Sequence, residues 1–162
     1  MRKFKSKNQF LSGLFLCLAL AVTAFIFYQS LKSREQSGAT SGFLMQLLKP
    51  LLDPENRIAE AVFHHYLRKT AHFTEFAALG LCWSAYGWQQ EIRTRKSRIL
   101  LPFLLTLSTA VADEYIQFFS HRGSAVTDVV LDYAGAVTGI GIVLLLKLCV
   151  RHWRSTKKEM PI

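Results

Sequence analysis

Hydrophobic positions along the chain gather into four long blocks that are separated by shorter polar stretches. The blocks cover residues 10–31, 70–88, 99–119 and 129–149. Each block is about 20 residues long, which is what a helix needs to cross a hydrocarbon core about 30 Å thick. The alternating pattern of a half-buried strand does not occur. The pattern therefore predicts an all-α, polytopic membrane helix bundle of about four transmembrane helices.

The connection between the first two blocks, residues 32–69, is longer than the other connections. Within it, residues 37–42 are rich in Gly, Ser and Thr, which is typical of a loop. Residues 43–52 are apolar but too short to span a membrane, and Pro50 is expected to break this segment.

A helix start follows this apolar segment. Asp53 has the type of an N-cap, Pro54 suits the first helical position, and Glu55 places an acid in the first turn. We therefore predict an interfacial or re-entrant helix between the first and second transmembrane helices.

The N-terminal block is preceded by a basic segment, as in a signal peptide. The block is longer than the apolar part of a normal signal peptide, and no small-residue cleavage site follows it. We predict an uncleaved signal anchor. The chain is accordingly divided into residues 1–36, the cytoplasmic N-terminus with its anchor helix, and residues 37–162, the remaining membrane domain.

Charge decides the orientation of this bundle. The formal net charge is +9, and such a balance would also suit a nucleic-acid surface. However, the basic residues form short clusters beside apolar blocks, and this distribution orients membrane helices. Residues 32–69 carry several basic residues too, but these are spread out and mixed with acidic ones. The N-terminus, residues 89–98 and the C-terminus are all rich in Lys and Arg and share one side of a four-span topology. We predict that this side is the cytoplasm and that no nucleic acid is bound.

Polar residues inside the apolar blocks converge on the opposite, outer side. A charge at the bilayer centre costs about 2.5–3.5 kcal/mol on insertion scales, so such residues should face one another or a water-filled cavity. We predict a ligand-binding pocket formed by Arg68, Lys69, His72, Glu75, Asp113, Glu114, Gln117, Arg122, Asp128 and Asp132.

The spacing of these residues supports a shared pocket. Arg68, His72 and Glu75 follow one another at i, i+4 and i+7, so they lie on one helical face. Asp113 and Glu114 are adjacent and point about 100° apart on a helix. These two carboxylates cannot line one pocket equally, and the sequence leaves open which of them does.

Small residues continue the acidic stripe of the last block. Asp128, Asp132, Gly135 and Gly139 share one face of the predicted helix. Glycines at such a position let two membrane helices approach closely. We expect this helix to contact a neighbour through its glycines and to present its carboxylates above the contact.

Two interpretations of the polar cluster remain open at this point. Carboxylates and arginines could pair only to dock three helices, or they could form a ligand site. His72 and Glu75, at i and i+3, could be an acid/base pair or metal ligands. Because the chain has neither an HExxH motif nor a Cys/His cluster, we expect no metal and no cofactor.

Two segments of this cluster resemble the signatures of the VanZ-like membrane protein family. Residues 68–80 read RKTAHFTEFAALG, and residues 113–139 read DEYIQFFSHRGSAVTDVVLDYAGAVTG. They occur in the family's order and extend the resemblance over roughly the C-terminal two-thirds of the chain. Many members have Pro-Gly before the arginine, where this chain has Ser120-His121 before Arg122, and many have Asn in place of Asp132.

The resemblance implies a bacterial multi-pass protein of the cell (inner) membrane. The family's namesake is associated with resistance to teicoplanin, a lipidated glycopeptide antibiotic that acts on wall precursors. A binding module for an envelope lipid, a wall-precursor head group or a lipidated glycopeptide is one hypothesis. The alternative is a membrane-embedded enzyme that modifies a lipid-linked head group, with His72 or Glu75 as general base and Arg122 as charge stabiliser. Membrane lipids are expected partners, and the sequence defines no oligomeric state.

Overall fold

The computed structural model describes residues 2–32, 34–120 and 125–159. These residues form five α-helices and no strand, which confirms the all-α prediction. The helices are α1 (Arg2–Leu31), α2 (Arg34–Leu52), α3 (Glu60–Thr94), α4 (Leu100–Phe119) and α5 (Val126–Glu159).

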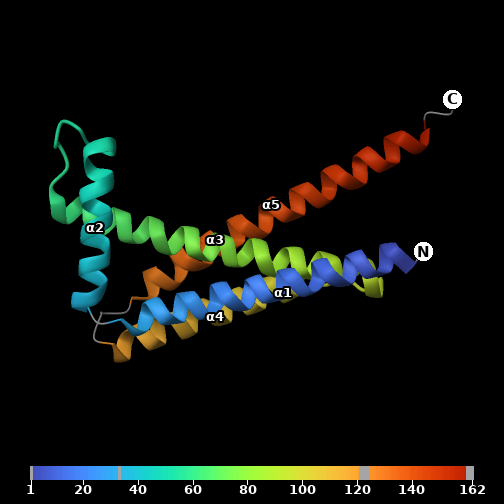
Figure 1. Ribbon diagram of the computed structural model, residues 1–162, viewed down its shortest axis with the longest axis horizontal. Helices are drawn as coiled ribbons and strands as arrows, with labels where there is room; N and C mark the ends of the chain where they lie inside the picture. The colour runs from blue at the N-terminus through green and yellow to red at the C-terminus, as the bar shows by residue number, and fades with distance from the viewer. Residues whose placement is uncertain (1, 33, 121–124, 160–162) are drawn as a thin grey trace.

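Four of the helices run along the long axis of the molecule, and α2 lies across one end of them (Figure 1). The N-terminus, the α3–α4 connection and the C-terminus lie at the end away from α2, as the alternation of helices predicts. The last part of α5 diverges from the other helices at that end.

The apolar blocks correspond closely to the helices. α4 begins within one residue of the predicted third span and ends with it, and α1, α3 and α5 contain the other three blocks. By length and composition, the segments Asn8–Leu31 and Val126–Lys157 are apolar enough to cross a membrane. α3 and α4 are not among these segments: α3 carries charged residues toward both of its ends, and α4 carries Asp113 and Glu114 in its second half.

The loop predicted at residues 37–42 is wrong, because this segment is helical and belongs to α2. A glycine inside a helix lowers the helix stability by only about 1 kcal/mol relative to alanine. A few Gly, Ser and Thr residues are therefore not enough to end a helix. A Cβ atom added at Gly38 or at Gly42 would meet nothing within 4 Å, so neither position requires glycine for its packing. Pro50 likewise does not break the segment. It lies in the last turn, and the helix ends two residues later at Leu52.

The helix start predicted at Asp53 is also wrong, because α3 begins only at Glu60. The Asp53 carboxylate instead accepts hydrogen bonds from the backbone N–H groups of Arg57 and Ile58, at 2.9 Å each. Asn56 adopts a left-handed conformation with φ 52°. An Asp cap serves a turn as well as a helix, and here it stabilises the reversal of the chain between α2 and α3.

The basic loop predicted at residues 89–98 is shorter than expected, because α3 continues through Thr94. Arg95 then adopts a left-handed conformation with φ 60°, and its N–H donates to the carbonyl oxygen of Glu91 at 2.8 Å. This is an αL type of helix end. The charged residues between 89 and 94 therefore extend the helix.

Glycines bring α3 and α5 into direct backbone contact. A Cβ atom on Gly80 would overlap the carbonyl oxygen of Ala136 on α5. Cβ atoms on Gly135 and Gly139 would in the same way overlap carbonyl oxygens of α3. The close approach predicted from the glycine stripe is confirmed, and its partner is α3. Around this contact lies a buried apolar cluster contributed by α1, α3, α4 and α5: Ile26, Phe76, Leu79, Ala110 and Ala136.

Ion pairs join α3 and α5 beyond the glycine contact, toward the end that holds the two termini. Glu91 accepts from the Lys147 ammonium at 2.5 Å and from the Arg151 guanidinium at 3.0 Å. The Lys147 and Glu91 side chains are only 12% and 20% exposed, so solvent screens this pair weakly.

Candidate functional site

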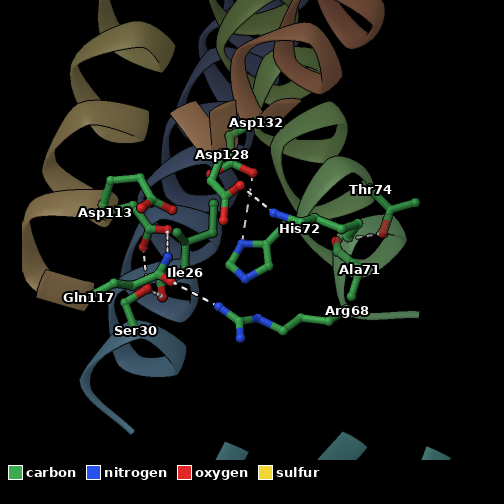
Figure 2. A network of polar contacts seen from close by, with 12 residues as sticks. Ile26, Ser30, Arg68, Ala71, His72, Thr74, Asp113, Gln117, Asp128 and Asp132 are labelled. Carbon is green, nitrogen blue, oxygen red and sulfur yellow. Dashed lines mark hydrogen bonds and ion pairs between the residues drawn. The ribbon is translucent and has the colours of Figure 1, made fainter. Parts of the chain in front are cut away.

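A polar cluster lies where α1, α3, α4 and α5 meet, near the end of the bundle that α2 crosses (Figures 1 and 2). At its centre is Asp113, which is completely buried. The Gln117 side-chain amide donates to one Asp113 oxygen at 2.7 Å, and the Ser30 hydroxyl pairs with the other. Because hydrogen bonds to an ionised group are the stronger ones, these contacts fix the orientation of the carboxylate.

Arg68 extends this arrangement to α3. Its guanidinium lies 3.4 Å from the side-chain carbonyl oxygen of Gln117 (Figure 2). Ser30, Asp113, Gln117 and Arg68 thus form one chain of polar contacts through α1, α4 and α3. In a low-dielectric interior such a satisfied network holds its members in one arrangement.

A second connection joins α3 to α5. Lys69 forms an ion pair with Asp128 in the first turn of α5. The Lys69 side chain is 29% exposed and that of Asp128 is 17% exposed, so the pair lies at the border between the cluster and the surroundings.

His72 and Asp132 face each other in the interior of the cluster (Figure 2). His72 Nδ1 lies 3.8 Å from Asp132 Oδ1. Asp132 is 1% exposed, and neither of its oxygens has a hydrogen-bond partner among the residues that the structure describes. His72, Asp113 and Asp132 each offer one ligand atom, and these atoms all lie within 4.8 Å of one another.

Asp113 and Glu114 turn to different sides, which answers the question that the sequence left open. Asp113 faces Ser30 of α1. Glu114 accepts a hydrogen bond from the backbone N–H of Ala125 at 3.2 Å and lines a small cavity. The cavity measures about 10 Å³, which is room for about one water molecule. Its other lining residues are Arg68, Lys69, His72, Asp128, Leu131 and Asp132.

A much larger groove of about 580 Å³ adjoins this cavity, between α3 and the start of α5. The two share Lys69, Asp128 and Leu131, so the Lys69–Asp128 ion pair stands between them. The groove mixes aromatic and aliphatic walls with polar groups, and its remaining lining residues are His65, Tyr66, Thr70, Phe73 and Thr127.

Most of the residues predicted for the pocket come together in this cluster. Arg68, Lys69, His72, Glu114, Asp128 and Asp132 line the small cavity, and Asp113 and Gln117 lie next to it. Glu75 is half-buried on α3, one turn beyond His72. Arg122 lies outside the described residues, as does His121.

Ser30 belongs to the cluster, although no sequence pattern predicted its place there. It is one hydroxyl near the end of an apolar block, where a serine that donates to a carbonyl oxygen of its own helix, here that of Ile26, is ordinary. The groove residues Tyr66, Phe73 and Leu131 were missed for a related reason, since aromatic and aliphatic residues are ordinary in a span and in the segment that leads into it. Only the packing of α1 and α5 against α3 makes these positions informative.

Comparison with known proteins gives one match. A family profile described as VanZ/LLP1 matches residues 15–147 and so covers most of α1 through most of α5. No curated protein and no solved structure matches the chain. The matched region contains the whole polar cluster, and together with the two apolar helices it indicates a membrane protein. This chain belongs to the VanZ/LLP1 family.

Proposed function

We propose that this chain is a multi-pass protein of the bacterial cell membrane that binds the anionic head group of an amphiphilic envelope molecule. The ligand would be a membrane lipid, a lipid-linked wall precursor or a lipidated glycopeptide. Binding of such a glycopeptide, or of its head-group target, would give tolerance to teicoplanin. The observation that carries the proposal is the open groove of about 580 Å³ that adjoins a buried polar cluster.

The composition of the groove suits an amphiphile. Its volume falls within the roughly 300–1,000 Å³ of sites for small molecules. Tyr66, Phe73 and Leu131 offer apolar surface to a lipid chain, while the Lys69 ammonium can bind a phosphate. A phosphate would compete with Asp128 for Lys69, and the ion pair can exchange one anion for the other without leaving the ammonium unpaired.

The proposed topology has four spans, α1, α3, α4 and α5, with α2 at the outer interface. Both termini would be cytoplasmic, because the basic residues of the α3–α4 connection and of the α5 end lie away from the polar cluster. The cluster and the groove would then open toward the outer leaflet, where wall precursors are used.

Cysteine labelling tests this topology. In a background in which Cys17, Cys82 and Cys149 are replaced by serine, Lys96→Cys and Val126→Cys are expected to react from opposite sides of the membrane. Lys96 is in the exposed α3–α4 connection and Val126 is 82% exposed at the start of α5. A membrane-impermeant maleimide should label only Val126→Cys in intact cells and both variants after lysis. Labelling of both in intact cells would contradict the four-span arrangement.

Lipid retention tests the ligand. Protein in phosphatidylcholine nanodiscs is exchanged with radiolabelled phosphatidylglycerol or undecaprenyl phosphate, and the label bound per chain is measured. Lys69→Gln should weaken retention of the anionic lipids about tenfold, because it removes one hydrogen bond to a charged group. Lys96→Gln removes the same charge from the other end of the bundle and should leave retention unchanged. Equal loss in both variants would indicate general charge attraction and contradict a localised site.

The alternative function is a membrane-embedded enzyme that modifies a lipid-linked head group. The 3.8 Å separation of His72 Nδ1 and Asp132 Oδ1 is what favours it, since a carboxylate beside an imidazole is a common acid/base arrangement. Release of a labelled head group in the same nanodiscs, abolished by His72→Ala, would establish the enzyme and overturn the binding-only function. Retention without release would exclude it for the lipid tested.

A further inference from the structure

We propose that His72, Asp113 and Asp132 bind one divalent transition-metal ion between α3, α4 and α5. The sequence carries no metal motif because each of these ligands comes from a different helix. Only the folded arrangement brings the imidazole and the two carboxylates together.

The donor atoms lie close to the separations that a single ion requires. One ligand atom from each residue lies within 4.8 Å of the other two, and His72 Nδ1 and Asp132 Oδ1 are 3.8 Å apart. Zinc binds nitrogen and oxygen ligands at about 2.0–2.2 Å, so two ligands of one ion lie about 3–4 Å apart.

The burial of Asp132 argues that a cation belongs beside it. Its side chain is 1% exposed, and both of its oxygens lack a hydrogen-bond partner among the described residues. A buried carboxylate costs several kcal/mol unless it is paired or coordinates a metal. The other buried carboxylates of the cluster have such partners, since Asp113 and Glu114 both accept hydrogen bonds.

The charges around the site point the same way. Two side chains with a permanent positive charge, Arg68 and Lys69, lie in the described part of the cluster, and Lys69 is already paired with Asp128. Five carboxylates of the predicted pocket lie on the described parts of α3, α4 and α5: Glu75, Asp113, Glu114, Asp128 and Asp132. A divalent cation would offset most of this excess negative charge.

The surroundings of Asp113 resemble the support that metal ligands usually have. Ligating carboxylates are themselves held by hydrogen bonds from neighbouring groups, and these groups tune the affinity for the metal. Ser30 and Gln117 provide such contacts to Asp113. The adjoining cavity of about 10 Å³ has room for about one water molecule, which could fill the fourth position of a tetrahedral ion.

The ligand set selects the class of metal. One imidazole nitrogen with two carboxylates suits zinc or manganese, whereas magnesium prefers an all-oxygen octahedral sphere. Because the three cysteines of the chain are free and could bind zinc elsewhere, they are replaced by serine before any measurement.

The test measures metal bound to the full chain in dodecyl maltoside, a detergent without phosphate and without added lipid. Protein stripped with EDTA is equilibrated with ZnCl2 or MnCl2 and desalted, and metal per chain is determined by mass spectrometry. We expect about one ion per chain and a Tm that is about 5 °C higher than in the stripped protein. His72→Gln and Asp132→Asn should each lower the affinity more than about 100-fold, and Gln117→Ala about 10- to 100-fold.

Two matched variants control for adventitious binding. His152→Gln changes an exposed histidine near the C-terminal end of α5, and Glu60→Gln changes an exposed carboxylate at the start of α3. Both should keep the ion, and all variants should elute as the wild type does on size exclusion. The proposal is overturned if the wild-type chain retains no ion, or if the controls lose it as fully as His72→Gln. Since no lipid ligand is present, failure here leaves the proposed head-group binding standing.

Discussion

Gly139→Leu is expected to separate α5 from α3 and to destabilise the protein by about 3 kcal/mol. The expectation follows from the glycine contact, since even a single Cβ at this position would overlap the carbonyl oxygen of Ala77 on α3. Overpacking a close-packed interior costs about 1–3 kcal/mol, and here the obstacle is backbone that cannot rotate away. The measurement is the midpoint of thermal unfolding in detergent, followed by fluorescence-detected size exclusion.

Gly141 provides the matched control for this substitution. It lies two residues further along α5, and a Cβ there would meet nothing within 4 Å. Gly141→Leu should leave the midpoint unchanged or raise it slightly, because leucine favours a helix more than glycine does. If both variants lose the same stability, the cost lies in the loss of glycine itself and the proposed close approach of α3 and α5 is refuted.

Glu91→Leu is expected to destabilise the protein by about 3 kcal/mol, because it removes the ion pairs between α3 and α5 near the end that holds the two termini. It leaves Lys147, which is only 12% exposed, without the anion that it contacts at 2.5 Å. Removing one partner of a largely buried ion pair costs about 3–5 kcal/mol, because the remaining charge stays desolvated. For Glu91→Leu we expect a value at the low end of this range, because the long Lys147 side chain can still extend its ammonium toward water.

A double substitution separates this effect from a simple loss of packing. In Glu91→Leu/Lys147→Leu both charges are absent, and most of the stability should return. Arg93→Leu, an exposed change in the same turn of α3, should change the free energy of unfolding by less than about 0.5 kcal/mol. A double variant as unstable as Glu91→Leu alone would mean that the ion pair does not hold α3 and α5 together.

The apolar pattern predicted the long helices well, because a helix that must bury or expose a continuous apolar surface leaves a strong signal. The limits of α4, predicted at residues 99–119 and observed at Leu100–Phe119, show this. Helix boundaries that were predicted from single residues were less reliable. Asp53 and Pro54 have the chemistry of a helix start, but the same carboxylate can accept two backbone N–H groups in a turn.

Only those features of the candidate site that depend on the spacing of residues within one helix could be predicted. The one face shared by Asp132, Gly135 and Gly139 followed directly from the 3.6-residue repeat, and the structure confirms its close contact. The different environments of Asp113 and Glu114 did not follow, because spacing along one helix cannot say which neighbour lies on which side. The contribution of Ser30 depends entirely on how α1 packs.

The contacts between α3 and α5 have a mechanical consequence. Three sets of contacts hold the two helices together. The Lys69–Asp128 ion pair lies near one end, the close backbone contact at the glycines lies in the middle, and the ion pairs of Glu91 with Lys147 and Arg151 lie near the other end. Two helices joined at three successive points can neither change their crossing angle nor slide past each other, so the pair moves as one rigid body. The groove is lined by α3 and α5. We therefore expect any opening and closing of the groove to come from its side chains, and spin-label distances between α3 and α5 beside the glycine contact to stay constant when a ligand binds.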